Sequence, residues 1–201
     1  MPASIKLPEP RYDSQFSLEQ ALLKRRSVRN YINEPIALSD LSQLLWAAQG
    51  ITEPVQGFRT APSAGATYPL EAYLVVGNVR ELKPGVYKYR SQGHQLAMLF
   101  EGDKRTGLCR AAYNQAAIRR AAAVIAISAV HTRTTGRYGD RGIRYVDMEA
   151  GHAGQNLALQ AVALGLATVM IGAFDDAGVK EILKLADDEA PLYLIPVGKP
   201  K

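Results

Sequence analysis

The sequence predicts an α+β fold in which a mixed, mainly antiparallel central sheet is flanked by helices. Apolar runs at residues 85–89 and 95–99 flank the turn-forming residues 91–94, a pattern typical of an antiparallel hairpin. Two later apolar runs, 122–130 and 167–171, are separated by a long amphipathic stretch, and a crossover of that length implies some parallel pairing. Helices with one apolar stripe each are expected to pack against such a sheet.

The N-terminal region is predicted to be an extended lead-in over residues 1–17, because its three prolines exclude regular helix. Residues 18–201 are expected to form one domain, since no linker or repeat interrupts them. Ser17 and Gln20 make a capping-box pattern, which predicts a first helix over residues 18–24.

The remaining elements follow from apolar periodicity and from turn residues. They are a helix that ends at Gly50, a loop over 51–69, strands over 71–76, 85–89, 95–99 and 122–130, a helix over 103–113, a polar loop over 132–142, a long helix over 143–165, a strand over 167–171, a helix that begins at Asp175 or Asp176, and a last strand over 193–197.

Composition narrows the class of protein. The chain has 201 residues, 47% hydrophobic and 21% charged, which is ordinary for a soluble globular domain. No apolar run approaches the roughly 18 residues that span a bilayer, and the N-terminus lacks an apolar signal core, so we expect a cytoplasmic protein with no membrane partner. The single cysteine, Cys109, is expected to be a small core residue.

The charge pattern argues against two kinds of site. The net charge is +5, but the cations are scattered without a basic run, so we expect no nucleic-acid partner. The three histidines, His94, His131 and His152, have no metal-ligand spacing, and we predict no metal site. His152 is expected to be a core histidine on the long helix.

A cluster of cations near the start of the chain is the main candidate binding site. Arg25, Arg26, Ser27 and Arg29 offer three guanidinium groups and a hydroxyl within five positions, a combination suited to a phosphate monoester. Lys199, after Val197 and Gly198, offers a further cation. The alternative is a solvated helix end, because cations there complement the helix dipole.

Six stretches in order resemble the nitroreductase family of FMN-dependent oxidoreductases. They are the arginine cluster with Tyr31, the helix that ends in Trp46-Ala47-Ala48-Gln49-Gly50, the loop Pro62-Ser63-Ala64-Gly65-Ala66, the stretch Glu149-Ala150-Gly151-His152 with Gln155-Asn156, the stretch Gly172-Ala173-Phe174-Asp175-Asp176, and Val197-Gly198-Lys199-Pro200. The Pro62 loop and the arginines and tyrosines of residues 137–145 are most similar to the SagB-type branch, which includes oxidases of peptide azolines.

The resemblance implies a homodimer with two FMN sites at the subunit interface and a nitroreductase-like fold. It also implies a ping-pong reaction in which NAD(P)H gives a hydride to flavin N5 and a small-molecule electron acceptor, such as a nitroaromatic or a quinone, then takes the electrons.

Matching positions assign roles to particular residues. The resemblance implies that Arg25, Ser27, Arg29 and Lys199 contact the FMN phosphate and that Arg26 contacts the ring or the ribityl chain. It implies that the backbone N–H of Gly172 faces N5, with Ala173 beside it, and that Pro62, Ser63, Ala64 and Gly65 reach the flavin from the partner subunit.

Tyr138 is a catalytic candidate, paired with Arg137. The azoline oxidases of the resembled branch use a Lys-Tyr pair here, and arginine cannot act as a base at neutral pH. This departure favours a reductase. A SagB-like dehydrogenase of a peptide azoline or another heterocycle, and a flavin-binding protein without turnover, stay open as alternatives.

Overall fold

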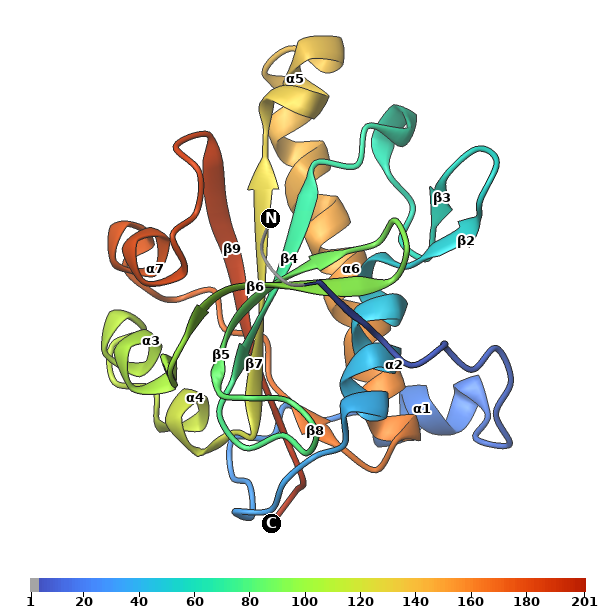
Figure 1. Cartoon of the computed structure of the whole chain (residues 1–201). Helices are drawn as coiled ribbons and strands as arrows, with labels where there is room; N and C mark the ends of the chain where they lie inside the picture. The colour runs from blue at the N-terminus through green and yellow to red at the C-terminus, as the bar shows by residue number, and fades with distance from the viewer. Residues whose placement is uncertain (1–3) are drawn as a thin grey trace.

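The fold is built on a seven-stranded sheet in a computed structural model that describes residues 4–201 (Figure 1). The strand order is β1-β6-β5-β4-β7-β9-β8, and each neighbouring pair in it is antiparallel. A separate two-stranded ribbon joins β2 to β3. The strands are β1 Ser4–Lys6, β2 Ile51–Glu53, β3 Phe58–Arg59, β4 Leu70–Val76, β5 Gly85–Arg90, β6 Gln95–Glu101, β7 Ala123–Val130, β8 Ala167–Thr168 and β9 Glu189–Gly198.

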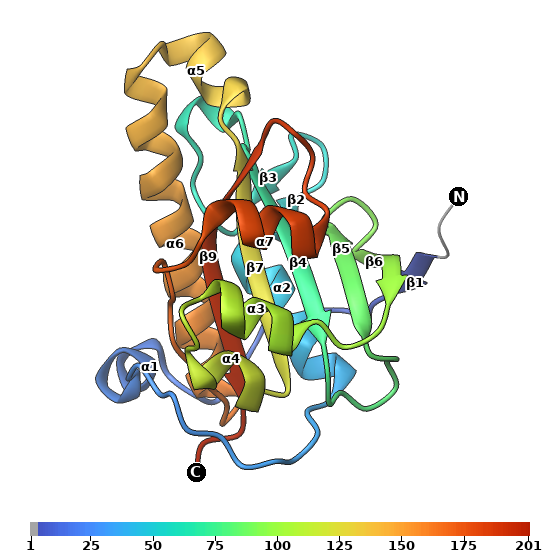
Figure 2. The ribbon, with the colours of Figure 1, turned by 90° about the vertical axis from the view of Figure 1, so that its left-hand side faces the viewer.

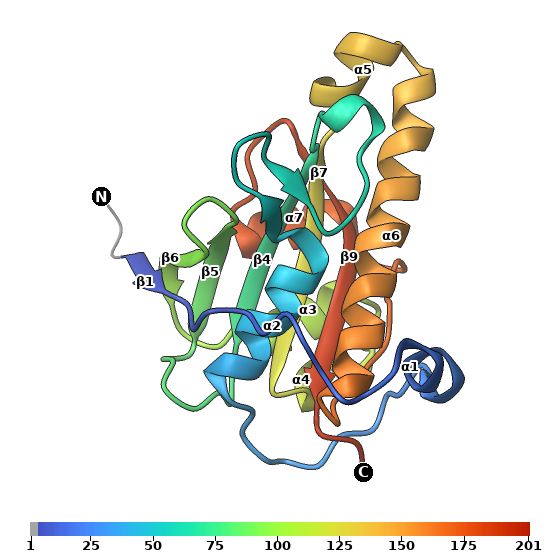
Figure 3. The same ribbon diagram turned by 90° about the vertical axis from the view of Figure 1, so that its right-hand side faces the viewer.

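Helices cover both faces of the sheet. The helices α3, α4 and α7 lie on one face (Figure 2), and α2 and α6 lie on the other (Figure 3), where they pack against each other. The helices are α1 Leu18–Lys24, α2 Leu38–Gln49, the single 3₁₀ turn η1 Ala64–Ala66, α3 Arg105–Ala111, α4 Ala116–Arg120, α5 Thr132–Tyr138, α6 Arg141–Ala163 and α7 Asp176–Leu183.

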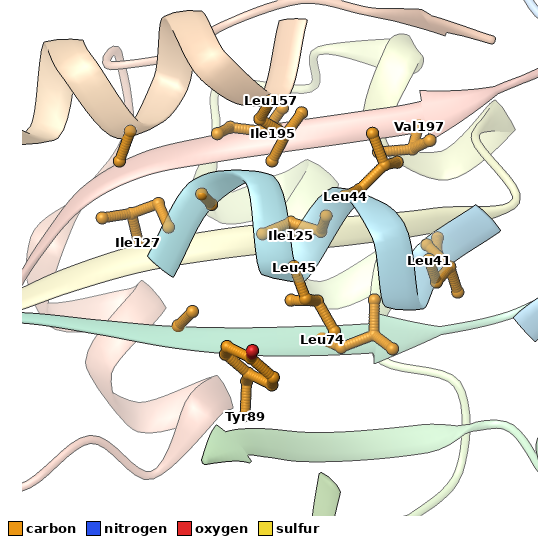
Figure 4. Packing of buried hydrophobic residues seen from close by; sticks show 14 of the residues in the cluster. Leu41, Leu44, Leu45, Leu74, Tyr89, Ile125, Ile127, Leu157, Ile195 and Val197 are labelled. Carbon is orange, nitrogen blue, oxygen red and sulfur yellow. The ribbon is translucent and has the colours of Figure 1, made fainter. Parts of the chain in front are cut away.

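Leucines of α2 form the centre of the larger core cluster. Leu41, Leu44 and Leu45 are fully buried between the sheet and α6, where they meet strand residues and Leu157 (Figure 4). A fully buried leucine contributes about 1.5–3 kcal/mol relative to an exposed one, so this stripe is a major source of stability. The opposite face of the sheet has its own cluster under α3, α4 and α7, and Cys109 is buried there, as predicted.

The structure confirms the α+β class and the antiparallel hairpin, whose strands β5 and β6 pair from Arg90 with Gln95 to Gly85 with Glu101, with one register shift between Val86 and Tyr87. The expected parallel pairing is limited to the isolated bridges Ser27–Thr168 and Ile36–Val79. The first helix begins as predicted, because the Ser17 hydroxyl accepts a hydrogen bond from the Gln20 amide.

Several local predictions need correction. The predicted loop over residues 51–69 contains the ribbon of β2 and β3 and the turn η1, and the last strand begins at Glu189 and not at residue 193. Residues 132–138 form the helix α5 instead of a loop, a second short helix α4 follows α3, and the strand predicted over 167–171 is reduced to β8 plus one bridge at Ile171. Within the predicted lead-in, residues 4–6 form β1, which pairs with β6 at the edge of the sheet. Each difference arises where tertiary contacts outweigh weak local preferences.

Candidate functional site

The segment that follows the basic cluster runs beside the segment that carries Lys199. The segment after α1 runs along the β8 and β9 edge of the sheet, where the Val28 amide donates to the Thr168 carbonyl at 2.9 Å and the Ile32 amide to the Lys199 carbonyl at 3.1 Å. The ring of Tyr31 is buried beneath Gly198, where a Cβ would lie 2.9 Å from it. Residues 140 and 167 positions apart in the sequence are thus joined by backbone hydrogen bonds.

The three arginines of the cluster and Lys199 differ in their hydrogen-bond and ion-pair partners. Arg25 is half-buried and Arg29 is exposed, and among residues 4–201 neither has a carboxylate within ion-pair distance. Arg26 donates from Nη1 to the carbonyls of Leu23 at 2.9 Å and Arg25 at 2.8 Å, so it caps the end of α1. Lys199 forms an ion pair with Glu34 at 2.6 Å. Arg25 and Arg29 are therefore the guanidinium groups available to an anion.

Gly172 and Ala173 lie on the same edge of the sheet as the basic cluster. Both are exposed, and they follow Ile171, which bridges to Leu194 of β9. A Cβ on Gly172 would meet only the Tyr193 ring and the Leu192 carbonyl at ordinary contact distances of 3.8 and 4.0 Å. No contact among residues 4–201 would prevent a side chain at this position, so glycine keeps this edge open.

The predicted loop residues and Tyr138 form a second group. The loop over residues 62–68, called the 62–68 loop below, packs against α5, and Arg137 Nη1 donates to the Gly65 carbonyl at 3.2 Å. Gly65 has φ +61°, and a Cβ there would lie 2.6 Å from the Tyr138 hydroxyl. The Tyr138 ring stacks edge-on against Tyr145, with 5.2 Å between centroids. Arg137, Tyr138 and the loop thus share one small surface.

Within one chain, the edge that carries the basic cluster lies far from the group formed by the 62–68 loop and Tyr138. The first group lies at the end of the molecule that carries α1 and the C-terminus, whereas α5 lies at the opposite end (Figures 1 and 3). The structure therefore pairs the backbone segment that carries Ser27 and Arg29 with the segments that carry Thr168 and Lys199, and it separately brings Gly65 next to Tyr138. A single chain does not form one site from all the predicted residues.

Sequence reasoning missed a buried carboxyl under the 62–68 loop. Glu149 of α6 is only 2% exposed, and its Oε1 has no hydrogen-bond partner among residues 4–201. Burial raises the pKa of Glu149 to about 7, against the opposing effects of a hydrogen bond with Ser63 and the charge of Arg59. A signal was present, because Glu149 shares helical spacing with the core residues Ala153 and Leu157.

A second buried network lies beneath α5. Glu189 is 5% exposed and accepts hydrogen bonds from the hydroxyls of Tyr73 at 2.6 Å and Ser128 at 2.9 Å, and from Lys88 at 3.1 Å. Burial alone would raise the pKa of Glu189, but these hydrogen bonds outweigh it and lower the pKa. Lys88 also pairs with Glu71, so the network reaches the edge of β4.

Two other predictions concern isolated residues. His152 is exposed on α6 and is not a core residue, so that prediction is wrong. The spacing of α6 residues explains the error, because the neighbouring Gly151 is also exposed while the buried face runs through Ala150 and Ala153. In the part of the chain that the structure describes, no group of three or more acidic, histidine or cysteine side chains could hold a metal ion, and no helix is long and apolar enough to cross a membrane.

Comparisons with known proteins agree with this fold and with the motif positions. The model of the "Nitroreductase family" matches residues 22–199. MJ1384 of Methanocaldococcus jannaschii, assigned as a nitroreductase, is 47% identical over 195 residues, which cover 97% of this chain and 96% of that protein.

Two solved structures have the same fold. A crystal structure assigned as a nitroreductase from Anabaena variabilis is 31% identical to this chain, with a TM-score of 0.86. The match covers 100% of this chain and 42% of that chain. The NADPH:FMN oxidoreductase of Vibrio harveyi, complexed with NAD+, is 21% identical with a TM-score of 0.66, over 92% of this chain and 69% of that one. Since the family model spans most of its length, the chain belongs to the nitroreductase family, a family of oxidoreductases.

Proposed function

We propose that the protein is an FMN-dependent NAD(P)H oxidoreductase that works as a homodimer and reduces a small acceptor such as a nitroaromatic or a quinone. One observation carries the proposal: Arg25 and Arg29, without acidic partners among residues 4–201, lie on the same sheet edge as the side-chain-free Gly172. The name of the V. harveyi relative, an NADPH:FMN oxidoreductase, supports the choice of cofactor and donor.

The residues of this edge fit a flavin mononucleotide. A phosphate monoester carries up to two negative charges, and guanidinium groups bind such anions through forked, charge-assisted hydrogen bonds. Arg25, Arg29 and the exposed Ser27 hydroxyl would hold the phosphate. Lys199 can join them by exchanging Glu34 for the phosphate, since both are exposed enough to move. Arg26 already caps α1, and its role would be to keep that helix end in place.

A dimer would complete the site, because the 62–68 loop and Tyr138 lie at the other end of the same chain. Exposed apolar side chains support association at both ends: Leu18, Leu22 and Leu23 on α1 are 53–64% exposed, and Ile143 and Met148 on α6 are 48% and 51% exposed. Exposed apolar groups of this size mark interaction surfaces when they cluster. A two-fold dimer would bring the loop of one chain to the basic edge of the other.

Bound FMN would supply two-electron hydride chemistry between the nicotinamide and the acceptor. The chain's own residues would bind and orient the cofactor and the substrate and exclude water from them. The backbone N–H of Gly172 can donate to the flavin edge without a side chain in the way. The small residues of the 62–68 loop admit a flat substrate, and the Tyr138 hydroxyl can give a proton to the reduced acceptor. Arg137 stays charged and cannot remove a proton.

The test is to purify the protein, reconstitute it with FMN, and follow the flavin absorbance anaerobically after adding NADH or NADPH, then a panel of acceptors. Bleaching by a nicotinamide and recovery with a nitroaromatic or quinone are expected. FMN binding without bleaching would instead indicate a flavin-binding protein without turnover. Oxidation of a peptide azoline with no nicotinamide would indicate the SagB-like alternative. Failure to bind FMN would refute the proposal.

A further inference from the structure

A cavity of about 560 Å³ lies where the strands β4 and β5 separate, and it is called the β4–β5 pocket below. Going toward the start of β4, the two strands pair only as far as Tyr73 with Lys88. Beyond that pair, within residues 4–201, Leu70 of β4 is paired only with β7 and Arg90 of β5 only with β6. The lining includes residues from both diverging ends, and cavities of this size hold small organic molecules.

Cations outnumber carboxylates in the lining of the β4–β5 pocket. Arg59, Lys88 and Arg90 line it together with one acidic residue, Glu71. The Glu71 carboxylate already pairs with Lys88 at 3.1 Å and with Arg133 at 2.6 Å. Lys88 is therefore neutralised within the chain, whereas Arg59 and Arg90 have no carboxylate within ion-pair distance among residues 4–201.

Arg59 is the cation of this lining that most needs a counterion, because its side chain is partly buried. Among residues 4–201 its guanidinium makes one hydrogen bond, from Nη1 to Gln49 Oε1 at 2.7 Å, and it lies 4.6 Å from the centroid of the Tyr68 ring. Burial lowers the pKa of Arg59, although Glu71 and Glu149 oppose this by charge from beyond ion-pair distance. A guanidinium has five N–H donors, and a partly buried charge is stabilised when a hydrogen-bonded anion pairs with it.

Gln49 adds an unsatisfied donor beside Arg59. Its side chain is only 2% exposed, and its Nε2 has no hydrogen-bond partner among residues 4–201. The amide cannot be turned over, because a guanidinium only donates hydrogen bonds and so requires Oε1 opposite Arg59. Two neighbouring residues of the pocket lining therefore have donors that lack an acceptor.

The rest of the lining distinguishes between kinds of anion. Leu70, Ala72 and Tyr89 are buried and give the pocket an apolar surface. Glu71 on the same lining would repel a phosphate monoester with two charges more strongly than a carboxylate with one. The two coplanar oxygens of a carboxylate also match the fork of a guanidinium. The lining thus fits a molecule with one carboxylate and an apolar body.

We propose that the β4–β5 pocket binds a small organic monocarboxylate, whose oxygens accept hydrogen bonds from the Arg59 guanidinium and the Gln49 amide. Arg90, which is exposed, adds a second positive charge at the opening. The pocket shares no lining residue with the basic edge that carries Arg25 and Arg29, so this site does not depend on the proposed flavin chemistry.

The test is calorimetric titration of the full chain, with and without FMN, with three cyclohexane derivatives that differ in their headgroup. They are cyclohexanecarboxylate, the neutral cyclohexanecarboxamide and cyclohexyl phosphate, and their rings are not flat enough to stack on a flavin. The carboxylate is expected to bind about tenfold more tightly than the amide, and also more tightly than the phosphate. Equal affinity for the carboxylate and the amide, or tightest binding by the phosphate, would overturn the assignment.

Two variants test the residues that hold the carboxylate. Arg59→Gln removes the charge and should weaken cyclohexanecarboxylate binding roughly 10- to 100-fold. Because Arg59 also packs on Tyr68, the second variant is Gln49→Glu, which keeps the side-chain shape and gives Arg59 a carboxylate within the chain. It should abolish binding while the midpoint of thermal unfolding stays at or above the wild-type value. Arg119→Gln, an exposed arginine of α4, is the matched control and should bind like the wild type.

Amide chemical shifts from nuclear magnetic resonance locate the ligand. Changes during the cyclohexanecarboxylate titration should centre on residues 70–72 and 89–90. Shifts centred elsewhere, undiminished binding in both Arg59→Gln and Gln49→Glu, or a wild-type chain that does not bind the carboxylate would overturn the inference. A failure to bind FMN would refute the proposed function alone, because the carboxylate titration without FMN would still decide the pocket.

Discussion

The double substitution Arg25→Ala with Arg29→Ala is expected to abolish tight FMN binding while leaving the fold intact. Arg25 ends α1 through its backbone, whose amide donates to the Ala21 carbonyl at 2.9 Å, and alanine keeps that bond. Arg29 is exposed. Neither side chain has an acidic partner among residues 4–201 that the change would leave unpaired. The cost should therefore fall on the ligand and not on stability.

The size of the effect follows from the two contacts removed. Each charge-assisted hydrogen bond contributes about 1.5–3 kcal/mol, so losing two costs about 3–6 kcal/mol. This corresponds to an increase in the FMN dissociation constant of about 10²–10⁴-fold. Riboflavin, which lacks the phosphate, should bind both proteins with nearly equal affinity, because the lost groups would contact only the phosphate of FMN.

The assay is titration of the cofactor-free protein with FMN and with riboflavin, followed by flavin fluorescence. The matched control is Arg110→Ala with Arg119→Ala, two exposed arginines of α3 and α4 whose loss changes the net charge by the same amount. That control should bind FMN like the wild type. FMN affinity within threefold of the wild type in the Arg25/Arg29 variant would refute the phosphate-site reasoning, as would an equal loss of riboflavin binding.

Three further predictions concern stability. Leu44→Ala should lower the free energy of unfolding by about 2–5 kcal/mol in urea titrations, because a fully buried leucine is lost from the α2 stripe; a loss below 1 kcal/mol would contradict the packing in Figure 4. Burial lowers the pKa of His94, whose ring nitrogens meet the Ser42 hydroxyl at 2.6 Å and the Tyr89 hydroxyl at 2.8 Å, so the unfolded state binds the proton more readily. Stability should therefore fall as the pH drops below about 6.5, and His94→Gln should reduce this slope in denaturation series at different pH values. Tyr73→Phe removes a hydroxyl donor from buried Glu189 and should cost about 1–3 kcal/mol in thermal or urea unfolding, and an unchanged midpoint would show that the network does not need it.

Elements with a strong periodic pattern could be predicted from the sequence. The apolar stripe of α2 ends at Gly50 as expected, the hairpin of β5 and β6 forms around its turn residues, and the Ser17 hydroxyl caps α1. In each case the determining interaction lies within a few positions of the chain, so neighbouring residues contain the information. The arginine cluster was identifiable for the same reason.

The tertiary structure decided the features that depend on residues far apart in sequence. The segment 132–138 has weak helix formers, yet it becomes α5 because it packs on α6 and Thr134 is buried against Thr67. Glu149 is buried although it is acidic, and only its helical spacing with the core residues Ala153 and Leu157 indicated this in the sequence.

The sequence by itself therefore determined the fold class, most of the elements and the phosphate-binding candidates Arg25 and Arg29, because local spacing and side-chain chemistry are written along the chain. Only the tertiary structure decided that Lys199 lies beside this cluster with Glu34 as its partner, and that the 62–68 loop lies at the opposite end with Tyr138. The place of Lys199 is set by backbone pairing at the sheet edge, and such pairing follows from how the whole sheet assembles rather than from any local pattern.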